Sequence, residues 1–264
     1  MATKTRLDAE LVRRGLARSR EHARELVDAG QVRIGGIVAT KPATGVGSDA
    51  SVTVAEAGDG YVSRGSVKLA GALDALGGPT VADRRCLDAG ASTGGFTDVL
   101  LRRGARSVAA VDVGYGQLAW RLRTDPRVEV HERTNVRDLT AERIGHQVEL
   151  VVADLSFISL RLVLPALSAV VHHDGDQLLM VKPQFEAGRE AVGRGGVVRD
   201  PAVRAESVSA VAVTAMALGW GTRAVVASPL PGPAGNVEYF VWLRKDAPGP
   251  DESAITRAVA EGPS

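Results

Sequence analysis

The sequence has one cysteine, few histidines and no long apolar run. The single cysteine, Cys86, leaves no possible disulfide within the chain, so the fold does not depend on an oxidising compartment. No apolar run approaches the length of about eighteen residues that a membrane span needs. The N-terminal segment has charges at Lys4, Arg6, Asp8 and Glu10 and does not resemble a secretory signal. We expect a cytoplasmic protein with no membrane contact.

Composition sets a few further bounds. The formal net charge of +1 does not identify a partner, so the distribution of charge along the chain has to be read instead. A chain of 264 residues with 45% hydrophobic residues can form one large or two unequal domains. The histidines do not have the spacing of metal ligands, so no metal site is expected; they are His22, His131, His146, His172 and His173.

The segment 87–96 reads Leu-Asp-Ala-Gly-Ala-Ser-Thr-Gly-Gly-Phe. A short apolar run ends in a carboxylate, turns through small residues and enters an amphipathic stretch. This order is typical of a strand, a tight turn and a helix, with room for a ligand against the backbone. A second apolar run, 107–112, ends in Asp112 about twenty residues further on, where a ribose would need an acceptor. The pattern predicts a site for a cofactor that contains a nucleoside.

Two residues of this turn bear on the choice of cofactor. Ser92 occupies the position at which a dinucleotide fold has its second glycine, which disfavours NAD and hydride transfer. Asp88 would repel a diphosphate but suits a cationic group, such as the amino group of S-adenosylmethionine. Both Asp88 and Asp112 could instead merely cap turns, and Asn135 could equally be a structural turn residue. The predicted cofactor-binding residues are Asp88, Gly90, Ser92, Thr93, Gly94, Gly95, Phe96, Asp112, Val113 and Asn135.

From residue 65 to 245 apolar runs alternate with amphipathic stretches, as in an α/β domain. We expect strands at 85–88, 107–113, 128–130, 149–154, 177–182, 222–227 and 237–243, and helices at 66–76, 95–103, 117–123, 160–172 and 202–218. The last two strands are joined by a loop too short for a helix, so the sheet should be mainly parallel with an antiparallel pair at its edge. Residues 58–64 read as a linker, and residues 246–264 as a loosely ordered tail with at most one weak helix, 253–260.

Residues 1–57 read as a small α+β module with two short helices and three short strands. Five arginines lie between residues 13 and 24, where the only acid is Glu21; they are Arg13, Arg14, Arg18, Arg20 and Arg24. Such a cluster is either a solvated helical face or a surface that contacts the phosphates of a nucleic acid.

The motifs of this module resemble the S4 RNA-binding domain. The resemblance rests on Arg6-Leu7-Asp8, on residues 15–20 (Gly-Leu-Ala-Arg-Ser-Arg), on Gly30-Gln31-Val32 and on Lys41-Pro42. It implies binding to structured RNA, and it makes Arg6, Arg18, Arg20 and Lys41 candidate contacts. We add Arg64, the last residue of the linker, and Arg189, in a loop over 186–198 that could order over RNA or be an ordinary surface loop.

Charged residues also stand at the ends of the later strands. Asp154 and Lys182 each follow an apolar run, Glu238 lies in the last expected hairpin, and Lys68 lies in the first turn of the helix 66–76. In an open α/β sheet the ligand crevice lies beyond the carboxyl ends of the strands. One such lysine alone is usually a surface residue, but four charged residues in this arrangement indicate a catalytic site.

Lys68, Asp154, Lys182 and Glu238 resemble the Lys-Asp-Lys-Glu tetrad of the FtsJ-like RNA ribose 2′-O-methyltransferases. Residues 88–97, 111–114, 154–157 and 182–186 resemble the motifs of that family as well. Together with the S4 module, the match is to the TlyA family and covers nearly the whole chain. It implies a class I, Rossmann-like methyltransferase domain with a seven-stranded sheet over residues 65–245, preceded by an S4 domain over residues 1–57.

The resemblance implies an S-adenosylmethionine-dependent enzyme that methylates the 2′-hydroxyl of cytidines in 16S and 23S rRNA within ribosomal subunits. Lys182 would either take the proton of that hydroxyl or stay charged and stabilise the alkoxide. No obligate protein partner is evident. The alternatives are a non-catalytic S4-type ribosome-assembly factor, an S4-bearing pseudouridine synthase and a membrane-active hemolysin, the last because the family has historically been given that label.

Overall fold

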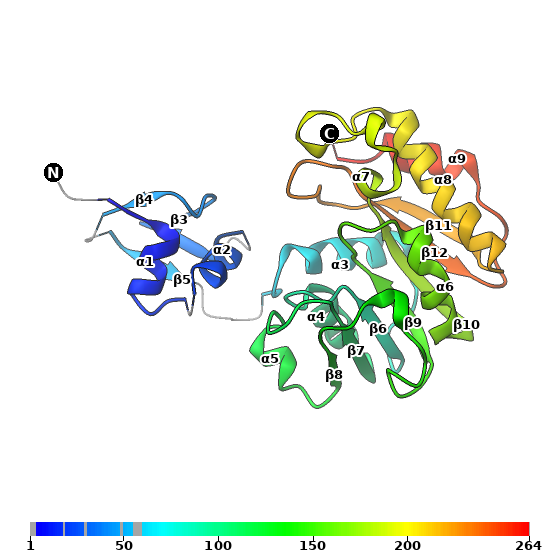
Figure 1. Cartoon of the computed structure of the whole chain (residues 1–264), viewed down its shortest axis with the longest axis horizontal. Coiled ribbons are helices and arrows are strands. Elements are labelled where there is room, and N and C mark those ends of the chain that lie inside the picture. Colours follow the sequence, from blue (N-terminus) through cyan, green and yellow to red (C-terminus); the bar gives the residue numbers. More distant parts are fainter. Residues whose placement is uncertain (1–3, 18, 29–30, 48–49, 55–59, 264) are drawn as a thin grey trace. The chain divides into compact units, whose positions relative to one another are not determined.

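The chain folds as two units, Met1–Val62 and Ser63–Ser264, which we describe separately. The computed structural model describes residues 4–17, 19–28, 31–47, 50–54 and 60–263. The division between the units falls within residues 58–64, where the sequence analysis expects a linker. Figure 1 labels most of the helices and strands of the two units.

The first unit packs two helices, α1 (Leu7–Arg13) and α2 (Arg20–Asp28), near a three-stranded antiparallel sheet. Its sheet has the order β3–β2–β5, formed by Ile37–Val38, Val32–Ile34 and Val52–Val54. Leu7 and Leu11 lie one turn apart on α1 and are completely buried, which is the pattern of a helix with one apolar face. The helices and this sheet are those predicted from the sequence.

Local signals explain where these helices begin and end. The Ser19 hydroxyl accepts a hydrogen bond from the N–H of His22 at 3.1 Å, the contact of an N-cap for α2. Gly15 follows α1 with a φ of +71°, which a glycine adopts without strain. Two more strands, β1 (Thr5–Arg6) and β4 (Gly45–Val46), pair with each other and were not predicted, because two residues show no periodicity.

The second unit is built on a seven-stranded sheet with the order β11–β12–β10–β9–β6–β7–β8. The strands are β6 (Arg85–Ala89), β7 (Ser107–Val111), β8 (Val128–His131), β9 (Val148–Ala153), β10 (Val171–Val181), β11 (Gly221–Ala227) and β12 (Tyr239–Arg244). The five strands β6 to β10 all run parallel to one another. Strand β12 is antiparallel to both of its neighbours, β10 and β11. All seven predicted strands are therefore present.

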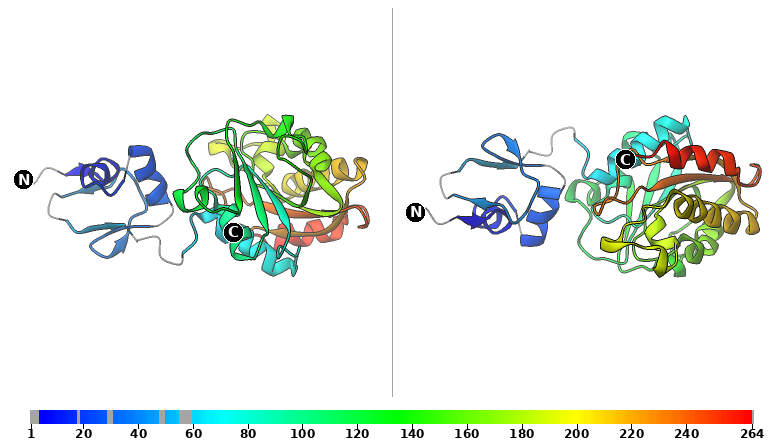
Figure 2. Two further views of the ribbon diagram at one scale, coloured as in Figure 1. Left: turned by 90° about the horizontal axis from the view of Figure 1, so that it is seen from below. Right: turned by 90° about the horizontal axis from the view of Figure 1, so that it is seen from above.

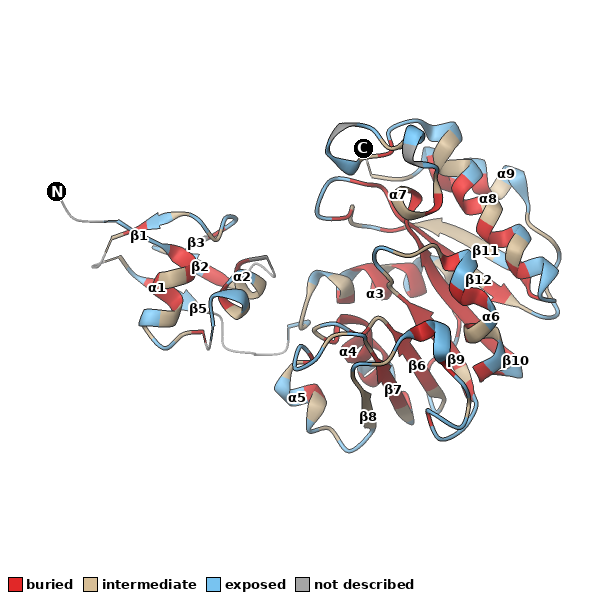
Figure 3. Ribbon diagram, in the orientation of Figure 1, coloured by how far each residue is buried: buried red, intermediate tan, exposed pale blue. Residues whose placement is uncertain are grey.

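Helices lie on both sides of this sheet (Figure 2). They are α3 (Arg64–Leu76), α4 (Gly95–Arg102), α5 (Trp120–Arg123), α6 (Leu160–Val170), α7 (Pro183–Glu186), α8 (Pro201–Ala217) and α9 (Glu252–Ala260), with short 3₁₀ turns at Val136–Asp138, Arg189–Ala191 and Arg194–Gly196. The side chains of β12 alternate between two faces. Tyr239 and Val241 join the core under α6, α8 and α9, while the Phe240 ring lies 6.0 Å from the ring of Phe96 on α4. The central strands are buried along most of their length (Figure 3).

The C-terminal segment corrects the sequence analysis. The possible helix at 253–260 is present as α9 (Glu252–Ala260), but the segment is not loosely ordered as expected, because α9 contacts α8 and β11. Asp251 caps this helix by accepting hydrogen bonds from the N–H groups of Ser253 and Ala254. Ile255 is completely buried in the main core. The burial of the apolar residues of α9, Ile255, Ala258 and Val259, depends on contacts with β11 and α8, which a local sequence pattern does not reveal.

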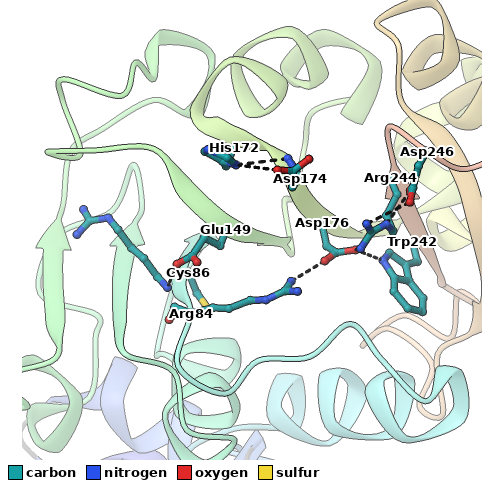
Figure 4. A network of polar contacts seen from close by, with 10 residues as sticks. Arg84, Cys86, Glu149, His172, Asp174, Asp176, Trp242, Arg244 and Asp246 are labelled. Carbon is teal, nitrogen blue, oxygen red and sulfur yellow. Dashed lines mark hydrogen bonds and ion pairs between the residues drawn. The ribbon is translucent and has the colours of Figure 1, made fainter.

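A buried carboxylate joins three strands at the end of the sheet remote from the carboxyl ends of its parallel strands (Figure 4). Asp176 of β10 is 1% exposed and accepts hydrogen bonds from Arg84 at 2.5 Å, from the indole N–H of Trp242 at 2.7 Å and from Arg244 at 3.3 Å. Arg84 precedes β6, and the other two residues belong to β12. These donors compensate for the desolvation of the buried Asp176 carboxylate. The cluster therefore holds β10, β12 and the start of β6 together at this end of the sheet.

If α9 is part of the core, removing its buried side chain must cost stability. Ile255→Ala should lower the free energy of unfolding by roughly 2–5 kcal/mol, as for other large-to-small changes in cores. Urea unfolding followed by the fluorescence of the buried Trp220 measures this. Thr256→Ala, at the exposed neighbouring position, is the control and should change stability little. Equal stabilities of the two variants would contradict the packing of α9.

Candidate active site

Strand register brings the predicted catalytic residues to one edge of the sheet. Ala89 of β6 pairs with Ala153 of β9, and Val181 of β10 pairs with Tyr239 of β12. The residues that adjoin these pairs are therefore neighbours at the carboxyl ends of the parallel strands, the edge at which α/β proteins bind ligands. They are Gly90, Asp154, Lys182 and Glu238.

The four charged side chains form two ion pairs. The Lys182 ammonium lies 2.5 Å from Asp154 Oδ1 and donates to the Ser156 hydroxyl at 3.1 Å. The Lys68 ammonium donates to Glu238 Oε2 at 2.6 Å. The side chains of both lysines and of Glu238 are less than a tenth exposed, whereas a quarter of the Asp154 side chain is exposed. Each buried charge thus has a partner of opposite sign.

Helix α3 is fixed against the glycine-rich turn, and this places Lys68. The buried Ser66 hydroxyl donates to the Gly95 carbonyl oxygen at 2.8 Å. A side chain at position 95 would collide with the hydroxyl of Ser63 and with the N–H of Ser66. Glycine at this position therefore permits the close approach of α3 to α4 on which the position of Lys68 depends.

The turn from β6 to α4 needs its glycines for two reasons. Gly90 has a φ of +88° and Gly94 a φ of +98°, values that side chains disfavour. A Cβ at Gly90 would also lie 2.5 Å from the carbonyl oxygen of Asp154. Ser92 has a φ of +47°, uncommon for a residue with a side chain. Backbone strain of this kind is concentrated at functional sites, and here it occurs at a residue that lines a cleft together with Asp112.

Asp88 is completely buried below this turn. Its Oδ2 accepts hydrogen bonds from the Thr97 N–H at 2.8 Å and the Thr97 hydroxyl at 2.7 Å, while its Oδ1 has no partner among the described residues. Burial raises the pKa of the Asp88 carboxyl to about 7, against the lowering effect of Thr97, and the charges of Asp154 and Asp112 raise it further. An acceptor left without a donor at a ligand edge fits a bound amino group.

Asp112 joins two turns beside a small cleft. Its Oδ2 accepts from the Ser92 N–H at 2.8 Å, and its Oδ1 accepts from the Gly114 N–H at 2.6 Å. A carboxylate has further acceptor positions, so Asp112 can also accept from hydroxyl groups in the cleft. The cleft is lined by Ala91, Ser92, Asp112, Gly114, Gln117 and Leu118, among others. The free acceptor positions of Asp112 match the hydroxyl donors of a ribose.

Other predicted cofactor residues have different surroundings. The Phe96 ring is 3% exposed and packs on Phe240 in the interior, so any contact of this residue with a cofactor would have to come from its backbone. Val113 lies 69% exposed just beyond β7. The Thr93 carbonyl accepts from the Ala119 N–H at 3.1 Å, which holds the turn to the segment before α5. Asn135 caps a 3₁₀ turn by accepting from the Arg137 N–H at 3.0 Å, which favours its structural role.

The sequence analysis missed two residues of this edge. Ser156 holds the ammonium of Lys182, and it lies two residues beyond Asp154 in a motif already recognised. Glu132 lines the same cleft as Asp112, accepts from the Gly116 N–H at 2.8 Å and is paired with Arg123. It directly follows β8, so the rule that pointed to acids after other strands could have found it. No group of three or more potential metal ligands occurs among the residues described here.

In the first unit the arginine cluster is organised by acids. The completely buried Asp8 accepts from Arg6 at 3.0 Å and from Arg20 at 3.2 Å, and Arg24 lies 3.6 Å from the same carboxylate oxygen. These three arginine side chains are 50–56% exposed. Glu10 is paired with Arg13 and Arg14 in the same way. Glu21 is thus not the only counter-charge, because acids from α1 face the arginines in space.

The remaining RNA candidates are less constrained. Lys41 is exposed. The carbonyl of its neighbour Pro42 accepts the N–H of Asp8 at 3.0 Å, so the backbone of Lys41 lies near the residue that binds the arginines. Arg64 begins α3 and donates to the Pro231 carbonyl at 3.2 Å. Arg18 lies outside the described residues, as does the side chain of Arg189.

Comparisons with known proteins agree with this architecture. Residues 61–245 match the model of the FtsJ-like methyltransferases, and residues 5–52 match that of the S4 domain. The chain belongs to the FtsJ-like methyltransferase family. The α/β fold with an N-terminal S4 domain, expected from the motifs, is thereby confirmed.

Relatives of this FtsJ-like methyltransferase align along most or all of its length. It is 61% identical to the 16S/23S rRNA (cytidine-2′-O)-methyltransferase TlyA of Mycobacterium tuberculosis (strain H37Rv), with 100% of each chain covered. It is 35% identical to Hemolysin A of Brachyspira hyodysenteriae, with 89% of this chain and 98% of that protein covered. A solved, hemolysin-named protein of Streptococcus thermophilus has a TM-score of 0.77 and 37% identity, and the match covers 99% of this chain and 96% of that one.

The hemolysin names raise the question of membrane contact. Within the part of the chain that the structure describes, no helix is both long and apolar enough to cross a membrane.

The burial of Asp88 makes stability depend on pH. Because its pKa is higher in the folded than in the unfolded protein, the folded state binds more protons between about pH 4 and about pH 7, and stability falls as pH rises through this window. Asp88→Asn removes this dependence. Urea unfolding of both proteins from pH 4 to pH 8 should show the wild type losing stability relative to the variant as pH rises. A difference that stays constant with pH would contradict the raised pKa.

Asp8 should act in the opposite sense. Hydrogen bonds from Arg6 hold the pKa of its carboxyl well below its usual range, against the effect of burial, so its stabilisation is present above about pH 4 and is lost as pH falls. Asp8→Asn leaves three guanidinium groups around a neutral side chain. At pH 7 hydrogen exchange in residues 5–54 should become faster than in the wild type. Glu21→Gln, at an exposed position of α2, is the control and should leave exchange unchanged.

Proposed function

We propose that this protein is an S-adenosylmethionine-dependent ribose 2′-O-methyltransferase that acts on cytidines of 16S and 23S rRNA in ribosomal subunits. The observation that supports it most is the pair of ion pairs, Lys182–Asp154 and Lys68–Glu238, at the edge next to the glycine-rich turn. The name of the M. tuberculosis relative, identical at 61% of positions, supports the choice of substrate. The S4 domain supports an RNA partner.

The chemistry explains why a lysine between acids is useful here. A ribose 2′-hydroxyl is a poor nucleophile at neutral pH, so it has to lose its proton as the new bond forms. Lys182 could accept that proton as a general base, or it could remain an ammonium and stabilise the oxyanion. In either role Asp154 and Ser156 orient the nitrogen of Lys182. The neighbouring Lys68–Glu238 pair contributes no net charge, because its two charges cancel.

S-adenosylmethionine, when bound, supplies a methyl group that is already activated by its sulfonium. The residues of the turn fit it. Asp88 Oδ1 would accept a hydrogen bond from the amino group, and Asp112 would accept from ribose hydroxyls in the cleft. Because the donor needs no further activation, most of the rate would come from holding the hydroxyl in line, and that is the work of positioned side chains.

The first unit would supply affinity for the RNA. Arg6, Arg20 and Arg24 present half-exposed guanidinium groups around one carboxylate, so together they have a net charge of about +2. Arginine matches the geometry of phosphate oxygens. Binding through such a surface should weaken steeply with salt.

Lys182→Ala tests the proposed function. The variant should bind S-adenosylmethionine as the wild type does, since Lys182 lies outside the cleft beside Asp112, but methyl transfer should fall by about 100- to 10,000-fold. Primer extension would map 2′-O-methylation on 16S and 23S rRNA in isolated subunits, and calorimetry would measure cofactor binding.

The matched control is Lys245→Ala, an exposed lysine beyond β12 near the Trp220 ring. It should keep the wild-type rate. Full activity of Lys182→Ala would refute the catalytic role of the ion pairs. A wild-type protein that binds rRNA but transfers no methyl group would instead indicate an assembly factor, and leakage from liposomes would indicate a hemolysin.

A further inference from the structure

The segment that contains Lys182 and the segment that contains Asp154 are joined at two places. The first is the ion pair itself, with the Ser156 hydroxyl beside it. The second lies on the far side of each segment, where Glu186, at the end of α7, meets the start of α6. Glu186 has no part in the reaction proposed above, yet its side chain is only 1% exposed.

The carboxylate of Glu186 contacts three successive residues. Its Oε2 accepts from the Ser159 hydroxyl at 2.6 Å and lies 3.3 Å from Arg161 Nε, and its Oε1 accepts from the Leu160 N–H at 2.6 Å. The main chain adds a bond, because Arg161 also donates to the Glu186 carbonyl at 3.2 Å. This is an N-terminal cap supplied by a segment remote in sequence.

The contact is favourable for a buried acid. The first N–H groups of a helix have no partner within the helix, and the helix dipole stabilises negative charge there. Short hydrogen bonds to a carboxylate are among the stronger ones in proteins. Without Glu186, the Leu160 N–H would be buried with no partner, so the two segments are held together firmly at this point.

The connection from Glu186 back to Lys182 is short and stiff. Pro183 stands at the first position of α7, where its ring suits a helical start. The Phe185 N–H donates to the Lys182 carbonyl and the Ala187 N–H to the Pro183 carbonyl, both at 2.9 Å. One turn of helix therefore transmits the position of Glu186 to the backbone of Lys182. On the other segment, only residues 155–158 separate Asp154 from the capped start of α6.

We propose that Glu186 is a positioning residue for methyl transfer, which sets the backbone of Lys182 relative to Asp154 by capping α6. The proposal rests on the proposed function for its reaction and on the contacts above for its geometry. A lysine side chain is flexible and has only its ammonium to hold it, so the separation of the two backbones decides whether Asp154 and Ser156 can both reach it. A misplacement of about 1 Å can cost about 100-fold in rate.

Glu186→Gln is the most informative variant. Glutamine has nearly the same size and can still accept from Leu160, but its amide nitrogen would face the donors of Arg161. The rate constant per cofactor-binding site should fall by about 10-fold or more, while KM for rRNA and the affinity for S-adenosylmethionine stay within about twofold. Calorimetry gives the concentration of cofactor-binding sites. Because the rate constant is expressed per site, a loss of folded protein does not lower it.

A second readout does not depend on activity. The chain has five lysines, so the side-chain ammonium and ε-methylene resonances of Lys182 can be assigned with a Lys182→Arg variant. In Glu186→Gln these resonances should move toward those of the exposed Lys245, because the contact with Asp154 loosens. If the wild type transferred no methyl group, the proposed function would fail, and the resonances would still decide whether Glu186 positions Lys182.

Asp176→Asn is the matched control. Asp176 is equally buried and also holds three residues (Figure 4). It lies in β10 six positions before Lys182, away from the edge that carries the ion pairs. This variant should lower the melting temperature while leaving the rate per cofactor site and the Lys182 resonances unchanged. If both variants reduced the rate equally, the effect of Glu186 would be general destabilisation and the positioning role would be refuted.

Ser159→Ala covers the case in which Glu186→Gln does not fold. It removes one partner of the carboxylate, together with the hydroxyl that accepts the Arg161 N–H at 3.2 Å, and leaves the Leu160 N–H bonded. It should shift the Lys182 resonances in the same direction and lower the rate by a smaller factor. Unchanged rate and resonances in Ser159→Ala and in any folded Glu186→Gln would overturn the proposal.

Discussion

The active edge of this protein depends on the antiparallel pairing of β12 with β10. If β12 were parallel to its neighbours, its first residue would lie at the opposite end of the sheet. Because Tyr239 pairs with Val181, Glu238 and Lys182 are adjacent instead. The pairing of Ala89 with Ala153 brings Asp154 beside Gly90 in the same way. One edge therefore gathers residues that are far apart in the sequence, and the glycine-rich turn lies among them.

The charges at this edge can be buried only because they are paired. Desolvation of a lone lysine or carboxylate is costly, and a partner at hydrogen-bond distance compensates for it. Lys68 with Glu238 and Lys182 with Asp154 have no net charge together. Asp88 has no cation, and its pKa is raised accordingly. The edge is thus most favourable for a ligand that brings a positive charge to Asp88 and leaves the ion pairs intact.

The sequence predicted those parts that depend on local pattern. The seven strands follow from apolar runs, and the strand-end residues follow from the rule that ligands bind at carboxyl ends. The errors arise where tertiary contacts decide. Helix α9 is stable because β11 and α8 cover Ile255. The pairing of arginines with Asp8 joins residues from two helices, so no count along the chain reveals it.

Buried carboxylates organise cations in both units, by the same physical reasoning. Asp8 holds three arginines that would otherwise repel one another, and the shared anion leaves their outer faces exposed in a fixed arrangement. A phosphate that binds them then pays little of the entropy of gathering side chains, which is how preorganisation improves affinity. Asp154 and Glu186 together do the same for one lysine, the first through its ammonium and the second through its backbone. In each case the acid acts by positioning a cation. A variant that lacks only the cation would therefore not reveal the role of the acid.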